Sequence, residues 1–198
     1  MLLSFIGILI VAYLCGSLNS AIIVCKLWGL PSPRSVGSGN PGTTNVLRLG
    51  SKKVAIVTLL GDAVKGLIPM LLGHALGLSM IQLCWVALLA VIGHMFPVFF
   101  SFKGGKGVAT TIGVLLGVSA PIGGWFILIW LVIAAVFRIS SLAALIGTIA
   151  TPFLGYWLLS PQTVIPLIIL ALLVLARHHA NIKRLLTGKE PKIGQKKP

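Results

Sequence analysis

Long apolar runs recur along the chain, separated by short segments rich in Gly, Pro and basic residues. A run of about 20 apolar residues matches the hydrocarbon core of a bilayer, which is about 30 Å thick. The pattern predicts an all-α membrane protein with seven transmembrane helices. Their expected ranges are 2–25, 54–72, 80–100, 108–119, 122–137, 142–159 and 164–176.

The connections between these runs contain no charged linker long enough to separate two domains. We therefore expect residues 1–198 to form a single polytopic membrane domain. The run 108–119 is short and Pro121 follows it, so this segment could be tilted, broken or partly re-entrant. A fold with six full spans and one re-entrant segment stays open.

The composition supports a membrane protein, and the topology of such a protein explains the high net positive charge. The chain is 57% hydrophobic and only 9% charged, whereas a soluble domain is about 25% charged. Its formal net charge is +14, because the chain has 16 Lys and Arg residues and only two acidic residues, Asp62 and Glu190. Nucleic-acid binding would require a soluble basic face, which these apolar runs do not supply. Membrane topology is the better explanation, so no nucleic-acid partner is expected.

The basic residues fall almost entirely in alternate connections between the predicted spans. Lys and Arg gather in the cytoplasmic loops of membrane proteins, so the amino terminus is expected outside and the carboxyl terminus in the cytoplasm. Dropping one span would break the alternation, which favours the count of seven. The predicted cytoplasmic segments are the loops at about 26–53, 103–107 and 138–141 and the tail 177–198.

The first of these loops reads Val-Gly-Ser-Gly-Asn-Pro-Gly-Thr-Thr-Asn at 36–45. Glycine lets backbone N–H groups approach a ligand closely, and consecutive N–H groups can bind an anion. Ser38, Thr43 and Thr44 add polar side chains, and Arg48 behind them can form two bonds to a phosphate. The loop is a candidate phosphate site; the alternative is a plain turn in which Thr44 or Asn45 caps the second span.

A second candidate loop reads Lys-Gly-Gly-Lys-Gly at 103–107. It places Lys103 and Lys106 beside glycine N–H donors, which suits a phosphate group. The spacing is not that of a Walker A loop. A short, positively charged connection between two spans is the alternative interpretation.

His178 and Asn181 follow the last predicted span. They are three residues apart, so a continuing helix would place them on one face, and the neighbouring His179 would point elsewhere. The lysines and arginines of this segment could simply lie on anionic lipid, but that does not explain the histidine and the asparagine.

Three titratable residues lie within predicted spans. Asp62 and Lys65 are expected to pair, because a lone carboxylate in lipid is costly, although Asp62 could instead orient Arg48 or Lys106. His94 is expected either to be buried with a hydrogen bond or to face a cavity. No metal site or cofactor is expected, because four histidines and two carboxylates offer no recognisable ligand set.

Taken together, three segments resemble a known family, the bacterial integral-membrane acyl-phosphate:glycerol-3-phosphate acyltransferases. The segments are 37–46 with Arg48, then 93–97 through 103–107, and finally 177–190. The likeness extends to Asp62, Lys65 and Ser141, so it covers nearly the whole chain. That family has seven spans, with its motifs at the cytoplasmic face of the bacterial inner membrane.

The resemblance implies a reaction and roles. The reaction is acyl transfer from an acyl phosphate to the 1-hydroxyl of glycerol 3-phosphate, giving 1-acylglycerol 3-phosphate (lysophosphatidic acid) and phosphate, the first step of bacterial phospholipid synthesis. The implied catalytic residues are Ser38, Arg48, Lys106, His178 and Asn181. The implied substrate-binding residues are Gly39, Asn40, Gly42, Thr43, Thr44, Asn45, Lys103, Gly104, Gly105, Gly107 and Ser141, with Asp62, Lys65, His94 and Glu190 in support.

One departure from the family is visible. Where the family usually reads Arg-His-Arg-Glu-Asn, this chain has His179 and Ala180 at the third and fourth places, so no carboxylate stands there. The general base stays open between His178 and the phosphate of the substrate. The alternative function is a membrane transporter for an organic phosphate or another anion, which should show polar residues through the membrane depth.

Overall fold

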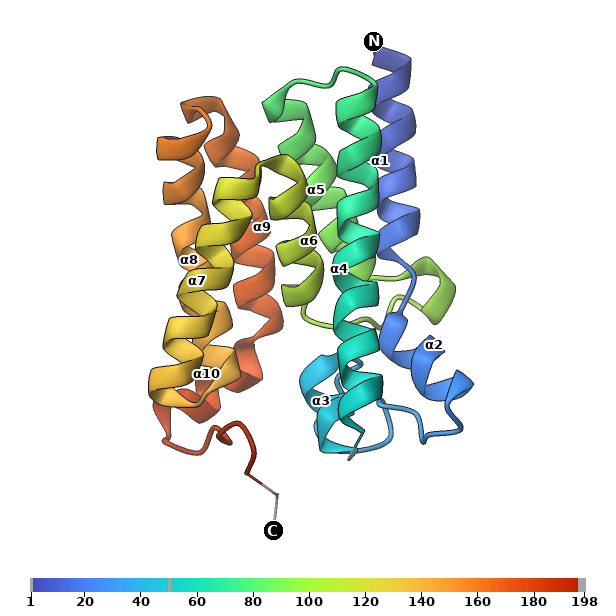
Figure 1. Cartoon of the computed structure of the whole chain (residues 1–198), viewed down its shortest axis with the longest axis vertical. Helices are drawn as coiled ribbons and strands as arrows, with labels where there is room; N and C mark the ends of the chain where they lie inside the picture. The colour runs from blue at the N-terminus through green and yellow to red at the C-terminus, as the bar shows by residue number, and fades with distance from the viewer. Residues whose placement is uncertain (1, 50, 196–198) are drawn as a thin grey trace.

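The computed structural model describes residues 2–49 and 51–195, so Lys196 and Lys197 of the predicted tail lie outside the described residues. Within these ranges the chain forms helices and no strand (Figure 1). In chain order the elements are α1 (Leu2–Gly16), α2 (Ser20–Leu27), α3 (Thr43–Arg48), α4 (Lys52–Ala75), α5 (Met80–Met95), η1 (Val98–Phe100), α6 (Val108–Val118), α7 (Ala120–Phe137), α8 (Ser140–Leu158), η2 (Pro161–Thr163), α9 (Val164–Arg177) and α10 (His179–Leu186).

The lengths of the helices agree with a membrane protein. Four are long and apolar enough to cross a bilayer, namely α4, α5 continued through η1, α7 and α8. Two bent pairs pass the same test, α1 with α2 at 43° and η2–α9 with α10 at 64°. The predicted short segment is α6, which is apolar but has only 11 residues. The count of seven spans, their orientation and the single-domain organisation stay predictions.

The first predicted span, 2–25, is not one straight helix, which corrects the sequence-based expectation. Asn19 accepts a hydrogen bond from the backbone N–H of Ile22 at 3.1 Å and so starts α2 as an N-cap. The carbonyl of Leu18 in the break accepts from Lys65 Nζ at 2.5 Å. The break is therefore held by a side chain from α4, not left unsatisfied.

The loop predicted at 26–53 also contains more structure than expected. The end of α2 enters it, and the short helix α3 follows Gly42. The cap of α4 is Ser51, whose side chain accepts from Val54 N at 3.2 Å. Neither Thr44 nor Asn45 caps the second span, because both lie inside α3.

Small residues let the helices pack closely, as is common in membrane proteins. A Cβ atom added at Gly66 would crowd the Thr110 carbonyl, and one added at Gly113 would overlap the Ala63 carbonyl, so α4 and α6 meet backbone to backbone. Gly16 of α1 contacts α5 in the same way. The buried core fills the space between helices with Phe126, Met70, Leu83, Met95 and Leu115, among others.

The four predicted cytoplasmic segments meet at one end of the bundle (Figure 1). Arg34 donates to the carbonyl of Phe100 at 2.9 Å, which ties the first loop to the loop before α6. Arg177 donates to Gly104 O at 2.8 Å, and the Ile193 N–H donates to Arg138 O at 2.6 Å. These bonds join all four segments at what we call the α3–α10 end.

Candidate active site

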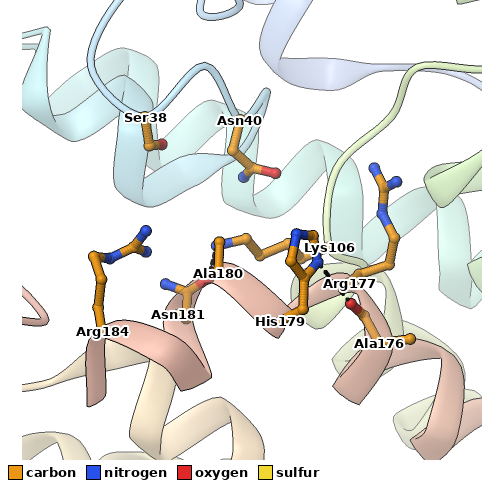
Figure 2. Close-up of a pocket in the computed structure, with 9 residues that line it drawn as sticks. All are labelled: Ser38, Asn40, Lys106, Ala176, Arg177, His179, Ala180, Asn181 and Arg184. Carbon is orange, nitrogen blue, oxygen red and sulfur yellow. Dashed lines mark hydrogen bonds between the residues drawn. The ribbon is translucent and has the colours of Figure 1, made fainter. Parts of the chain in front are cut away.

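A cavity of about 360 Å³ opens at the α3–α10 end. Figure 2 shows its two sides: Ser38 and Asn40 project from the loop before α3 and face residues of α9, α10 and the loop before α6. Its lining is Ser38, Asn40, Lys106, Ala176, Arg177, His179, Ala180, Asn181 and Arg184. Three segments that are far apart in the sequence thus share one cationic pocket.

The loop that carries Ser38 and Asn40 is held by Asn45. The Asn45 amide nitrogen donates to Pro33 O at 2.7 Å and Val36 O at 3.0 Å, and its oxygen accepts from Ser38 N at 2.9 Å. Asn45 was expected to bind substrate, but its buried amide is fully engaged with the loop backbone. The structure therefore gives it a bracing task and leaves the exposed Ser38 side chain on the pocket wall.

The backbone N–H groups of Gly104 and Gly105 were expected to be exposed donors, but both are bonded within the chain. Gly104 N donates to Met95 O at 3.1 Å, and Gly105 N donates to His94 O at 3.2 Å. Their carbonyl oxygens accept from Arg177 at 2.8 and 3.1 Å. Glycine is needed because a Cβ atom at position 104 would overlap the His94 carbonyl. The pair fixes the backbone that carries Lys106.

Lys106 lies at one end of a hydrogen-bond network that is centred on Glu190. Its Nζ donates to Asn181 Oδ1, and Asn181 Nδ2 donates to Glu190 Oε1 at 2.5 Å. Glu190 also accepts from Ser141 Oγ at 2.7 Å and from Arg184 Nε at 2.6 Å. Ser141 was expected to bind substrate, but its buried hydroxyl is directed at Glu190. Glu190 thus braces the last motif, and Ser141 supports it.

The electrostatics of this network favour a bound anion. Burial lowers the pKa of Lys106 to about 8; Glu190 opposes that shift, and the positive charges of Arg184, Arg48 and Arg177 add to it. Burial alone would raise the pKa of Glu190, but hydrogen bonds from Ser141, Arg184 and Asn181 hold it below its usual range. A phosphate would relieve the repulsion among the cations.

His178 lies at the bend between α9 and α10. It is 2% exposed, and its Nδ1–H donates to Val174 O at 2.8 Å, which leaves Nε2 without the ring proton. Burial lowers the pKa of His178 to about 4, against the effect of the Val174 bond, so the ring is neutral at pH 7. Asn181 is buried as well, whereas His179 is exposed. His178 is therefore the histidine that shares the inner face with Asn181.

The remaining predicted residues, among them Arg48 and Gly107, are not part of the cavity lining. Arg48 is exposed in the last turn of α3, close enough for its charge to act on Lys106. Gly107 has a positive φ of 87° and starts α6, so it sets the direction of that helix. The other predicted positions, Gly39, Gly42, Thr43, Thr44 and Lys103, are not among the residues that line the cavity.

The sequence missed two arginines on the pocket wall. Arg177 appeared as the first residue of the motif at 177–190 and Arg184 as a charge of the tail, and neither was assigned a role, yet both line the cavity. Spacing contained a signal for one of them, because Arg184 is three residues after Asn181 and falls on the same helical face. The place of Arg177 depends on Gly104 and Gly105 across the bundle, which no local pattern reveals.

Of the four residues predicted as support, Asp62, Lys65 and His94 are buried inside the bundle and do not line the pocket. Asp62 and Lys65 of α4 pair at 2.7 Å, as the sequence predicted. His94 Nδ1 lies 2.9 Å from Lys65 Nζ and 3.7 Å from Asp62, so it is buried with a partner. Asp62 therefore contacts this group and not Arg48 or Lys106. Among residues 2–49 and 51–195, no group of three or more His, Cys, Asp or Glu could hold a metal ion.

The family model for glycerol-3-phosphate acyltransferase matches residues 6–188. A glycerol-3-phosphate acyltransferase of Thioalkalivibrio sulfidiphilus is 55% identical over 93% of this chain and 92% of the relative. One of Vibrio campbellii is 50% identical over 94% and 91%. The crystal structure of PlsY (YgiH), an integral membrane glycerol 3-phosphate acyltransferase in its glycerol 3-phosphate form, superposes with a TM-score of 0.90 at 39% identity, covering 96% of each chain.

Apolar helices around a cationic pocket, in a fold shared with PlsY, define an integral membrane enzyme. The chain belongs to the glycerol-3-phosphate acyltransferase family. Membership decides against the transporter that the sequence left as an alternative, and it supports the resemblance drawn from the three motifs.

Proposed function

We propose that this enzyme transfers an acyl group from an acyl phosphate to the 1-hydroxyl of glycerol 3-phosphate, at the cytoplasmic face of a bacterial inner membrane. The products are 1-acylglycerol 3-phosphate and inorganic phosphate. The observation that carries the proposal is the convergence of Ser38, Lys106 and Asn181 on one cavity whose wall also holds Arg177 and Arg184.

Both substrates are phosphate esters or anhydrides, so the site has to gather negative charge. Arginine forms two parallel hydrogen bonds to a phosphate, and lysine supplies a compact charge. In our proposal Lys106 and Arg184 hold one phosphate while Arg48 approaches from α3. The relatives from two bacteria and PlsY carry glycerol 3-phosphate in their names, which supports this substrate class.

The reaction depends on the positioning of the two substrates more than on a strong acid, base or nucleophile. The 1-hydroxyl oxygen attacks the acyl carbonyl carbon, the bond from that carbon to the phosphate oxygen breaks, and phosphate leaves with the electron pair. Holding the two substrates together removes the entropy cost of their encounter. Ser38 and Lys106 donate hydrogen bonds to the oxygen atoms where negative charge develops.

The hydroxyl proton goes to the phosphate of a substrate in our proposal. His178 is buried, is not part of the cavity lining and has a pKa lowered to about 4 by burial, so it is a weak base. It acts instead as a positioning residue at the bend that directs α10 and Asn181 toward Lys106.

Purified protein in detergent tests the proposal. With a long-chain acyl phosphate it should release inorganic phosphate only when glycerol 3-phosphate is present, and mass spectrometry should find 1-acylglycerol 3-phosphate in equal amount. Turnover with acyl coenzyme A in place of acyl phosphate would contradict the proposed donor. A 2-acyl product would contradict the proposed hydroxyl.

A further inference from the structure

One arginine on the pocket wall has no part in the proposed reaction. Arg177 is the last residue of α9 and lines the cavity. Two of its N–H groups are bonded to the protein backbone, because Nε donates to Gly105 O at 3.1 Å and Nη2 donates to Gly104 O at 2.8 Å. The guanidinium group is therefore engaged with the loop before α6, although it stands in a pocket that suits a phosphate.

The direction of the Arg177 side chain agrees with this engagement. Its guanidinium carbon lies 5.5 Å from the ring centroid of Phe96, a distance at which the face of an aromatic ring attracts a cation. In the view of Figure 2 the guanidinium group lies on the opposite side of Lys106 from Arg184. Lys106 and Arg184 hold a phosphate in the proposed reaction, so Arg177 is directed away from the place of that phosphate.

The loop that Arg177 binds is also held from its other side. Gly104 N donates to Met95 O at 3.1 Å and Gly105 N donates to His94 O at 3.2 Å, both at the end of α5. A Cβ atom at Gly105 would overlap the imidazole of His94. The two glycines thus give their N–H groups to α5 and their carbonyl groups to α9. Lys106 follows them directly, so its backbone cannot shift without breaking these bonds.

The segment that carries Arg177 also supplies the partner of Lys106. Lys106 Nζ donates to Asn181 Oδ1, and Asn181 follows Arg177 by four residues across the bend at His178. One segment therefore binds the backbone before Lys106 and the ammonium group at the end of its side chain. Two attachments to the same segment fix the direction in which Lys106 enters the cavity.

We infer that Arg177 is a positioning residue, which holds Lys106 in place through the carbonyl groups of Gly104 and Gly105, and that it is not a phosphate ligand. The inference rests on the proposed function, which gives Lys106 its part in the reaction. Arginine suits the task because its planar guanidinium can bond two carbonyl groups at once, whereas a lysine ammonium is a single point charge.

A double-mutant cycle tests whether Arg177 acts through Lys106. Displacing a catalytic group by about 1 Å can cost about a hundredfold, so Arg177→Met should lower kcat/KM for glycerol 3-phosphate by roughly that factor. In a Lys106→Met background the same change should lower kcat/KM by less than about threefold, since no ammonium group is left to position. Losses that multiply would overturn the inference, because Arg177 would then bind substrate directly or maintain the fold.

Two further variants separate the two carbonyl bonds from positive charge. Arg177→Lys keeps the charge but cannot span both carbonyl groups, so it should retain no more than about a tenth of the wild-type kcat/KM. Wild-type activity in this variant would overturn the inference, because charge alone would then suffice. Lys183→Met is the matched control: it removes an exposed charge of α10 outside the cavity lining and should change kcat/KM by less than about twofold. A control loss as large as that of Arg177→Met would also overturn it.

Amide hydrogen exchange gives a readout that does not depend on the substrates. Arg177→Met should speed exchange at Gly104 and Gly105 by at least about tenfold, while the amides of α4 keep their wild-type rates. Faster exchange throughout the chain would show that Arg177 stabilises the whole fold, and unchanged rates at the glycines would show that the loop does not need it. Either result overturns the inference. If the wild type does not use acyl phosphate, only the proposed donor fails, and exchange still decides whether Arg177 holds the loop.

Discussion

The two acidic residues of this chain contact basic side chains in two very different surroundings. Asp62 lies inside the bundle and contacts Lys65 and His94, all of them nearly inaccessible to solvent. Glu190 lies at the α3–α10 end and contacts Arg184, beside a cavity that is also lined by the basic side chains of Lys106 and Arg177. In the first group the buried carboxylate is paired with its basic neighbours. In the second group the positive charge of Lys106, Arg177 and Arg184 exceeds what Glu190 can balance.

This difference indicates that the Asp62 group stabilises the fold and that the Glu190 group serves the pocket. A buried charge must be paired where it lies, so the Asp62 group holds three segments together: α4, α5 and the break before α2, through Leu18 O. At the pocket, Glu190 orders Asn181 and Arg184, and Lys106 faces the cavity. An excess of ordered positive charge next to a cavity is what a phosphate-binding site requires.

Breaking the buried group should give the largest effect. Asp62→Asn leaves Lys65 without its counter-charge inside the bundle, which typically costs about 3–5 kcal/mol of folding free energy. The measurement is the free energy of unfolding in mixed micelles, followed by circular dichroism. The double variant Asp62→Asn, Lys65→Met removes both charges and should recover most of the loss; a single variant as stable as the wild type would show that the pair is dispensable.

Much of this arrangement could be predicted from the sequence. Apolar runs and alternating charge are local signals, so they gave the helices and the convergence of the charged connections at one end. The Asp62–Lys65 pair followed from a spacing of three residues in a helix. The break at residues 17–19 was missed, because the run 2–25 is apolar apart from a few short polar residues, and only the Asn19 cap and the bond from Lys65 reveal it.

The site was harder to predict, since residue type does not tell where a short polar group points. Asn45 and Ser141 looked like substrate contacts, but tertiary packing turns both inward, to the loop backbone and to Glu190. The N–H groups of Gly104 and Gly105 looked free, but they complete the end of α5. Such assignments depend on partners beyond the neighbouring helical turn, 12 residues away for Asn45 and Pro33 and 49 residues away for Ser141 and Glu190.

Removing the positive charge of Lys106 should abolish most of the activity while leaving the fold intact. Lys106→Met deletes the ammonium that faces the cavity, and loss of one such group typically lowers catalysis by about a hundred- to a thousandfold. The measurement is kcat/KM for glycerol 3-phosphate, with unfolding as the control for structure. Lys26→Met, exposed at the end of α2, should change kcat/KM by less than about twofold. Comparable losses in both variants would mean that the general positive charge matters and not the pocket.

A smaller loss is expected from His178→Gln. Glutamine keeps a polar group at the bend but cannot accept a proton, so a loss of kcat below about a hundredfold would fit a positioning role. A loss well above that value, together with disappearance of the acidic limb of the kcat profile, would make His178 an obligatory base.

The smallest effect should come from titrating the pocket without changing a residue. Because burial lowers the pKa of Lys106 to about 8, its charge is present below that pH and is lost above it. We expect kcat/KM for glycerol 3-phosphate to fall above pH 8, by roughly tenfold per pH unit, and Lys106→Arg to remove this limb because arginine does not titrate there. Unfolding through this group cannot produce the same loss: the folded pKa lies below the ordinary value of 10.5, so the contribution of Lys106 to stability rises from pH 8 to pH 10.5. If kcat/KM of the Lys106→Arg variant still falls above pH 8, another group is responsible for the titration. Lys106 would then resemble the buried, structural Lys65 and not a residue of the phosphate site.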